Sequence, residues 1–378
     1  MKEPLSIIQI IPRAGCHSGG TFQAYQLAKA LLDKGHNSLL ITRPGKQAVE
    51  RAKDMKIPVE TIRMKNEWDF KSIMALRRII TERKVNVVHA HKGLALSLSL
   101  FALMGNRRTV LVANRGVMFP LDPFNRLKYR SGKLDAVVAV SSVVKDITVK
   151  SSGLKENKVR VIYGGTDLQR FNWQISPLAM RNEFKINNAY PVVGIVANIR
   201  SWKGHIYFVE AAAKVLTRFP EAKFFIVGGY KEERDTYKNL MAKIDELGIG
   251  KSIFITGFRD DIPELMAGMD ITVNASYDGE GLTGTIRESF AMKKPVIATR
   301  IAGNPELVEE GVTGILVKPK SPDALSEAMI SLLGDRERLA LMGENAYRTV
   351  LERFSLQSRI NNIENLYYEL LSCKRKKN

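Results

Sequence analysis

Cysteine is scarce in this sequence of 378 residues, which contains only Cys16 and Cys373. The two lie near opposite ends of the chain, and neither belongs to a CxxC pair or to a Cys/His spacing typical of zinc sites. The sequence therefore predicts neither a disulfide framework nor a structural zinc centre. We expect two reduced thiols in a cytoplasmic protein.

Long hydrophobic runs are also missing. The most apolar stretch, residues 94–104, has about half of the roughly 20 residues that a membrane-spanning helix needs, and it contains Ser97 and Ser99. The first residues pass into a short apolar run without the hydrophobic region and cleavage site of a signal peptide. We expect a buried crossover helix at 94–104 and no export.

Acidic residues are few in the first half only. Residues 1–172 carry 30 Lys and Arg against 13 Asp and Glu, a net charge of +17, whereas residues 173–378 carry 28 against 26, a net charge of +2. A positive surface of this size attracts nucleic acid, an acidic membrane leaflet or a phosphorylated substrate. Charge alone does not choose among these partners.

What the sequence does contain is a repeated alternation of short apolar runs and helical segments, which predicts parallel α/β sheets. Expected strands in the first half are Leu5–Ile11, Ser38–Thr42, Val59–Arg63, Val85–His89, Thr109–Ala113, Ala136–Val140 and Val159–Tyr163. The alternation restarts with Val192–Ala197, Phe224–Val227, Ile253–Thr256, Ile271–Asn274, Val296–Ala298 and Gly314–Val317. The pattern favours two Rossmann-like domains, residues 1–172 and 173–356, facing each other across a cleft.

Helices are expected from Ser321 to the end, with breaks near Gly334 and Gly343. The last one, 357–372, is expected to pack back onto the first domain. In parallel sheets, ligands bind at the carboxyl ends of strands, and phosphates favour the unpaired N–H groups of helix N-termini. Candidate site residues are therefore sought in strand-to-helix loops.

Two glycine-rich loops follow predicted strands. In the first, Gly19 and Gly20 open a helix and permit close approach of a ligand, although a tight packing turn explains the same glycines. The second, Gly279–Gly284, has the dinucleotide spacing G-x-G-x-x-G and precedes a helix expected to begin near Thr285. That interpretation is disfavoured because the loop comes late in its sheet and because Glu280 would lie beside a pyrophosphate.

Two glutamates eight positions apart, Glu280 and Glu288, flank this second loop. Spacing alone is weak evidence, since Glu344 and Glu352 share it in a helical stretch and are interpreted as surface charge. The surrounding run, Asn274–Thr299, nevertheless resembles the E-x7-E motif of retaining GT-B glycosyltransferases, family 4. Further matches in the family's order are Gly19-Gly20, Val87–His91, Ala139-Val140-Ser141, Gly165-Thr166-Asp167 with Phe171, Lys203-Gly204, Val227-Gly228-Gly229, Gly257 with Pro263, and Ala302–Val308.

The resemblance implies a nucleotide-sugar donor bound in the second domain. It assigns Lys203 to the diphosphate, Glu288 to the ribose diol and Glu280 to sugar hydroxyls or to positive charge at the reacting carbon. Elementary chemistry agrees, since a departing diphosphate needs cations and helix N-termini, and a carboxylate accepts two hydrogen bonds from a diol. Backbone N–H groups of the loop are expected to contact the sugar or phosphates. These belong to Leu282, Thr283, Gly284 and Thr285.

Three features complicate the site. The family usually has an arginine where this chain has Asn198, so Arg200 is the candidate replacement. The usual histidine-glycine of the first domain is Arg115-Gly116 here, and that contact is not transferred. His89 and His91 lie on one predicted strand and are expected to point to opposite faces. One ring should then be packed and the other should face the cleft, with His91 favoured for a catalytic role.

The predicted function is a metal-independent, retaining hexosyltransferase without a cofactor, since the nucleotide sugar is a substrate. A UDP-sugar is favoured as donor, with GDP- and ADP-sugars as alternatives. The basic first domain favours a phosphorylated or lipid-linked saccharide acceptor of polysaccharide or lipopolysaccharide synthesis, with peripheral binding to an anionic membrane and no nucleic-acid partner. A sugar-nucleotide epimerase and a non-catalytic protein that binds anionic surfaces are the alternatives. A divalent metal near Asp278 and Glu280 is disfavoured because Lys203 supplies positive charge.

Overall fold

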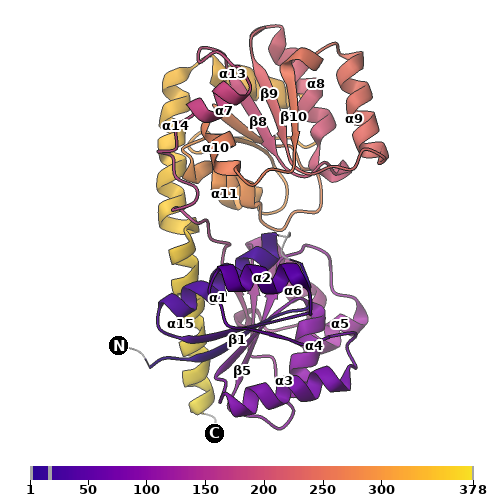
Figure 1. Cartoon of the computed structure of the whole chain (residues 1–378), viewed down its shortest axis with the longest axis vertical. Coiled ribbons are helices and arrows are strands. Elements are labelled where there is room, and N and C mark those ends of the chain that lie inside the picture. The colour runs from indigo at the N-terminus through magenta and orange to yellow at the C-terminus, as the bar shows by residue number, and fades with distance from the viewer. Residues whose placement is uncertain (1–2, 16–18, 377–378) are drawn as a thin grey trace. The chain divides into compact units, whose positions relative to one another are not determined.

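The computed structural model describes residues 3–15 and 19–376, so Cys16 lies outside the described residues, whereas Cys373 is an exposed free thiol. The chain forms two units, residues 1–165 with 357–378, and residues 166–356, against a predicted boundary after residue 172. Each unit is built around one parallel sheet (Figure 1). No helix in the described parts of the chain is long and apolar enough to span a membrane.

The sheet of unit 1 has seven strands in the order β3-β2-β1-β4-β5-β6-β7. The strands are β1 (Ser6–Ile11), β2 (Asn37–Thr42), β3 (Val59–Thr61), β4 (Val87–His91), β5 (Val110–Arg115), β6 (Ala136–Ala139) and β7 (Val159–Val161). The helices are α1 (Gly19–Asp33), α2 (Lys46–Asp54), α3 (Phe70–Glu82), α4 (Gly93–Ala102), α5 (Pro123–Tyr129), α6 (Ser142–Ser152), the 3₁₀-helix η1 (Glu156–Lys158) and α15 (Leu356–Arg375). Strand order reverses between β1 and β4, which marks a ligand-binding position in such sheets.

Unit 2 repeats this plan with six strands in the order β10-β9-β8-β11-β12-β13. They are β8 (Val192–Val196), β9 (Lys223–Val227), β10 (Ile253–Gly257), β11 (Ile271–Asn274), β12 (Val296–Thr299) and β13 (Gly314–Val317). The helices are α7 (Leu178–Glu183), η2 (Ser201–Lys203), α8 (His205–Leu216), α9 (Asp235–Glu246), η3 (Gly250–Ser252), α10 (Ile262–Ala267), α11 (Gly284–Ala291), α12 (Asn304–Leu307), α13 (Pro322–Leu333), α14 (Arg336–Thr349) and the π-helix η4 (Val350–Phe354). Here the order reverses between β8 and β11.

Both faces of each sheet are covered, which explains why the strands are runs of buried β-branched and aliphatic residues rather than alternating ones. In unit 1, α3 and α4 pack on one face, and α1 packs on the other. The expected crossover helix at 94–104 is α4. Its serines bond back to carbonyls one turn earlier, as Ser99 does to Ala95 at 2.7 Å, so they are satisfied inside the apolar layer.

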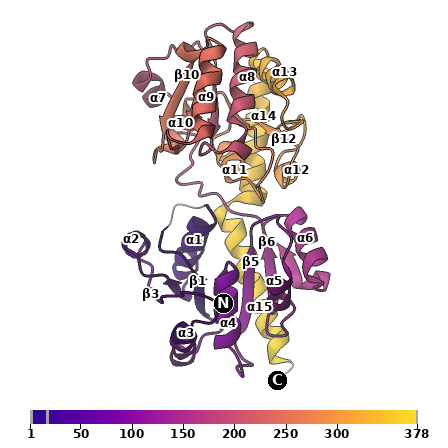
Figure 2. The same cartoon turned by 90° about the vertical axis from the view of Figure 1, so that its right-hand side faces the viewer.

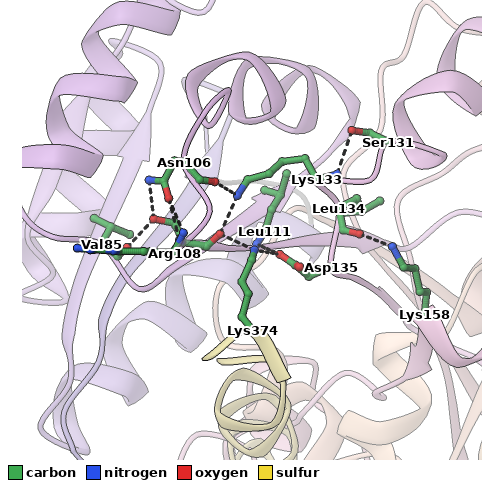
Figure 3. Close-up of polar contacts among 11 residues, drawn as sticks. Val85, Asn106, Arg108, Leu111, Ser131, Lys133, Leu134, Asp135, Lys158 and Lys374 are labelled. Atoms are coloured by element: carbon green, nitrogen blue, oxygen red, sulfur yellow. Dashed lines mark hydrogen bonds and ion pairs between the residues drawn. The ribbon is translucent and has the colours of Figure 1, made fainter. Parts of the chain in front are cut away.

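Helix α15 lies beside the sheet of unit 1 (Figures 1 and 2). Its buried face includes Ile363 and Tyr367, and its C-terminal end is held by Lys374. The Lys374 ammonium donates to Asp135 Oδ2 at 2.6 Å and to the Thr109 carbonyl at 2.7 Å (Figure 3). Asp135 also accepts from the Leu111 amide at 2.8 Å, so one carboxylate joins α15 to the starts of β5 and β6.

The expected helix break at Gly343 is wrong. Helix α14 runs through this position without interruption, from Arg336 to Thr349. A Cβ atom at Gly343 would overlap the carbonyl oxygen of Lys293, so the glycine permits α14 to pack closely on the segment after α11. Gly343 is therefore needed for close helix packing and does not mark a helix end.

Candidate functional site

The loops after β8 and β11 meet at the point where strand order reverses in unit 2, and they bring Lys203 and Glu280 together. The Lys203 ammonium forms an ion pair with Glu280 Oε1. The Ser276 hydroxyl donates to the same oxygen at 2.9 Å. Glu280 is nine-tenths buried, so its charge needs these partners. Two residues 77 positions apart thus form one charged centre at the position expected for a ligand.

Backbone geometry fixes this centre. Lys203 ends the short helix η2, and Gly204 follows with a φ of 74°, in the left-handed region that favours glycine. A Cβ atom at Gly204 would overlap the carbonyl oxygen of Ala275. The Tyr277 amide in turn donates to the Trp202 carbonyl at 2.8 Å. The two loops are therefore in direct backbone contact, which positions both charged side chains.

Glu288 lies one turn into α11 and is half-buried. Burial raises the pKa of its carboxyl group, and the positive charges of Arg287 and Arg170 oppose that rise. Among the described residues, no hydrogen bond or ion pair to the Glu288 carboxylate is found. A half-buried carboxylate with unused acceptors is suited to a ligand that supplies hydroxyl donors.

In the glycine-rich loop between the two glutamates, one side chain makes structural contacts, and the backbone N–H groups are the expected ligand donors. The Thr283 hydroxyl donates to Asn304 Oδ1 at 2.8 Å, so this side chain does not cap α11. Asn304 also donates to Asn274 Oδ1 at 3.1 Å and to the Thr299 carbonyl at 3.0 Å. The sequence did not predict this buried network, although Asn304 lies in the Ala302–Val308 match to the family. The expected backbone donors start the helix or precede it, namely Leu282, Thr283, Gly284 and Thr285.

Asn198 and Arg200 have different surroundings. Asn198 Oδ1 accepts from the Gly229 amide at 2.8 Å, so this side chain joins the loops after β8 and β9. Arg200 directly precedes η2 and is half-buried. Within the described parts of the chain, its guanidinium makes no hydrogen bond or ion pair. Arg200 remains the available cation beside Lys203, whereas Asn198 has a structural partner.

Unit 1 has a cavity of its own, of about 480 Å³, at the carboxyl ends of β4 and β5. Gly20 of α1 and His91 of β4 both line it. A Cβ atom at Gly19 or Gly20 would meet nothing within 4 Å, so tight packing does not require these glycines. The remaining lining residues are Lys92, Gly93, Asn114, Arg115, Gly116, Val117, Phe119, Pro120, Leu121, Asp122, Asn125 and Tyr129.

The expectation that His89 and His91 point to opposite faces is wrong. Residues two apart on a strand share a face, and the two rings stack with centroids 4.5 Å apart. His91 Nε2 bonds Gln9 Oε1 at 2.7 Å, and His89 Nδ1 bonds the Tyr367 hydroxyl at 2.6 Å. Burial lowers the pKa of His91 to about 3 and that of His89 well below its usual value. Both rings are neutral and held in place, with His91 at the cavity wall.

Positive charge gathers at this cavity. Lys92 precedes α4 with a φ of 95°, a strained conformation for a residue with a side chain, and burial lowers its pKa to about 8. Arg115 is nine-tenths buried, and its Nε has no hydrogen-bond partner among the described residues. The carboxylate of Asp122 is engaged by the Asn125 amide at 2.8 Å, at the start of α5. The sequence pointed to Arg115 only as a departure from the family pattern.

The chain matches two models of known protein families, one in each half of the sequence. Residues 178–349 match the family model of glycosyl transferases group 1, and residues 17–170 match that of Glycosyltransferase Family 4. This chain is a group 1 glycosyltransferase. The first match contains Lys203, Glu280 and Glu288, and the second contains the cavity of unit 1. The predicted family is confirmed.

The glycosyltransferase is also similar to individual proteins of known structure or function. A solved glycosyltransferase from Rickettsia africae ESF-5 is 26% identical, with a TM-score of 0.89, over 98% of this chain and 99% of that chain. The predicted GT-B fold of two parallel-sheet domains is thereby confirmed. N-acetyl-alpha-D-glucosaminyl L-malate synthase from Bacillus anthracis is 24% identical over 80% of both chains. A UDP-Gal:alpha-D-GlcNAc-diphosphoundecaprenol alpha-1,3-galactosyltransferase from Escherichia coli is 24% identical over the same shares.

Proposed function

We propose that this glycosyltransferase moves a hexosyl group from a nucleotide sugar to an anionic saccharide acceptor, phosphorylated or lipid-linked, with retention of anomeric configuration. The observation that carries the donor assignment is the Lys203–Glu280 centre where strand order reverses in unit 2. A UDP-sugar is the favoured donor, with GDP- and ADP-sugars as alternatives. The name of the Escherichia coli relative, which specifies UDP-Gal, supports this preference.

Each donor group has a partner in unit 2. An ammonium has three N–H donors, so Lys203 can bond the diphosphate while it stays paired with Glu280. Arg200 and the first turn of α11 add positive charge, and Glu288 accepts from the ribose diol. Glu280 then holds sugar hydroxyls or stabilises positive charge at the anomeric carbon.

Retention follows from a front-face reaction. The acceptor oxygen attacks the anomeric carbon on the side from which the diphosphate departs, and the leaving phosphate oxygen takes the acceptor proton. The residues around Lys203 need only stabilise the separated charges. Proton NMR of the first-formed glycoside tests this mechanism, because the anomeric coupling should match that of the donor. An inverted product would contradict this mechanism but not the assignment of the donor site.

The acceptor assignment rests on the cavity of unit 1. Lys92, Arg115 and the backbone amides at the start of α4, which the Lys92 side chain does not cap, favour a phosphate or carboxylate on the acceptor. Malate in the name of the Bacillus anthracis relative and a diphosphate-linked lipid in that of the Escherichia coli one support an anionic acceptor. Polysaccharide or lipopolysaccharide synthesis at the cytoplasmic side of a membrane is the corresponding setting.

We predict that Arg115→Met and Lys92→Met each raise KM for an anionic acceptor by about tenfold, the loss of one charge-assisted hydrogen bond. KM for the donor should stay unchanged. Because the pKa of Lys92 is about 8, its charge is present below that pH and is lost above it, so acceptor KM should rise above pH 8 in the wild type. This rise should vanish in Lys92→Met and persist in Lys150→Met, which alters an exposed lysine of α6. An unchanged acceptor KM in both cavity variants would refute the assignment.

Turnover is expected to survive EDTA, because the leaving diphosphate is met by Lys203 and backbone N–H groups. The same assay with added Mg²⁺ or Mn²⁺ is the control. Activity that chelation abolishes and a divalent ion restores would show that the proposed charge stabilisation is insufficient.

A further inference from the structure

A cluster of large apolar side chains is exposed on unit 1, over α3 and α5. Phe70 is 70% exposed, Leu127 69% and Trp68 67%. Met74, one turn beyond Phe70 on α3, and Phe124 on α5 are exposed by nearly half. We call these five residues the apolar rim.

The members of the rim belong to one surface. Helix α3 packs on α4 and α4 packs on α5, on one side of the sheet (Figures 1 and 2). The Trp68 ring lies 5.2 Å from that of Phe101 on α4. Glu67, next to Trp68, pairs with Lys128 of α5 at 2.6 Å. Lys128 in turn lies 4.3 Å over the Phe124 ring, so the segment before α3 and α5 are directly joined.

Positive charge surrounds the rim. Residues 63–78 and 122–133 together contain nine Lys and Arg against three Asp and Glu. All three acidic groups have partners within unit 1. Glu67 pairs with Lys128, Asp69 accepts from the Ser72 amide at 3.1 Å, and Asp122 accepts from the Asn125 amide. Exposed cations near the rim are Lys65, Lys71, Arg77, Arg126 and Arg130.

This combination favours a lipid surface over a protein partner. Protein interfaces are depleted of lysine at their centres, whereas membrane-bound amphipathic surfaces combine aromatic and aliphatic side chains with Lys and Arg. Basic side chains near an anionic leaflet each add attraction, and Trp, Phe and Leu gain by leaving water for the acyl boundary. Charge complementarity therefore specifies an anionic leaflet.

Helix α5 connects this surface to the cavity of unit 1. Asn125 and Tyr129 line the cavity, whereas Phe124 and Leu127 on the same helix are exposed. We propose that the apolar rim docks unit 1 on an anionic lipid surface, so that the head group of a lipid-linked acceptor reaches the cavity along α5. This inference deepens the proposed function and rests on it for the acceptor.

Sedimentation with vesicles tests the proposal. The full chain is mixed with vesicles of phosphatidylcholine alone or with about one-third phosphatidylglycerol, at low and high salt. We expect binding to the anionic vesicles that weakens with salt. Phe70→Ser with Leu127→Ser should lower the partition coefficient at least about tenfold, since two large apolar anchors are lost. Leu178→Ser with Leu341→Ser, two exposed leucines of unit 2, is the matched control and should bind as the wild type.

The outcomes are distinguishable. Circular dichroism and nucleotide-sugar titration of each variant separate a failure of docking from a failure to fold or from a failure of the proposed donor site. Equal vesicle binding by rim and control variants would overturn the proposal. Binding that is absent while nucleotide-sugar affinity is normal would overturn docking and leave the proposed function intact. A change of oligomeric state confined to the rim variant would assign the surface to a second copy of the chain instead.

Discussion

Replacing Lys203 by alanine is expected to lower kcat/KM for glycosyl transfer by about 10²–10³-fold. A loss of this size is typical when one preorganised group that stabilises transition-state charge is removed. Lys203 lies in the loop after β8, which we call, together with the loop after β11, the donor loops. Its ammonium also neutralises the nine-tenths-buried Glu280. Its removal therefore weakens the field at the diphosphate and leaves a carboxylate with Ser276 as its remaining partner. Steady-state kinetics with donor and acceptor varied separately measure the loss.

Two variants separate catalysis from stability here. Lys214→Ala removes an exposed lysine of unit 2 that pairs with Asp323, and this variant should keep wild-type kinetics. The double variant Lys203→Gln with Glu280→Gln removes both charges but keeps two side chains that can hydrogen-bond each other. It should therefore fold as the wild type and be inactive. Wild-type turnover by that folded double variant would show that Lys203 and Glu280 do not act in catalysis.

Gly204→Ala is expected to lower the free energy of unfolding by more than about 4 kcal/mol, a value confined to a few severe mechanisms. Two costs combine at this position. A residue with a Cβ pays about 1–2 kcal/mol for left-handed backbone, and the new methyl group would overlap the Ala275 carbonyl oxygen. Because Ala275 and Gly204 lie in the two donor loops, the variant should also displace Lys203 from Glu280. Chemical denaturation measures the change.

Gly248→Ala supplies the comparison, since Gly248 has a φ of 66° and nothing within 4 Å of an added Cβ. This variant should lose only the backbone cost of about 1–2 kcal/mol and keep full activity. The difference between the two variants then measures the loop contact alone. Equal destabilisation by both would mean that the contact between the donor loops is not what fixes Lys203.

Much of the fold was predictable because both sheets are covered on two faces. Strand β11, for example, has the predicted bounds Ile271–Asn274, since a short run of buried residues after a glycine-containing turn is typical of a parallel strand. The loop and helix that follow were also expected, and α11 begins within one residue of the expected Thr285. Local pattern was sufficient for these elements.

Contacts between distant segments were not predictable in the same way. The sequence placed Lys203 and Glu280 in separate loops, but their ion pair depends on strand order, which brings β8 beside β11. Gly343 was interpreted as a helix break because its packing partner, the Lys293 carbonyl, is fifty residues away. The error on His89 and His91 was different, since strand periodicity alone places them on one face.

The cavity of unit 1 could not be assembled from the sequence either. Its lining comes from α1, β4, the start of α4, β5, α5 and the segment between β5 and α5, and no short motif contains more than part of it. The strained φ of Lys92, and an Arg115 Nε that finds no partner among the residues that the structure describes, are visible only in three dimensions. Net charge directed attention to the first domain but did not identify these residues.

Calorimetric titration of the full chain with UDP-, GDP- and ADP-sugars tests the central claim, that unit 2 holds a nucleotide-sugar donor. We predict that one nucleotide class binds with a Kd between about 1 µM and 1 mM. Glu288→Ala should weaken that affinity at least about tenfold. Glu352→Ala, from the exposed glutamate pair of equal spacing, should leave it unchanged. Absence of binding by every nucleotide sugar, or equal affinity in wild type and Glu288→Ala, would contradict the account.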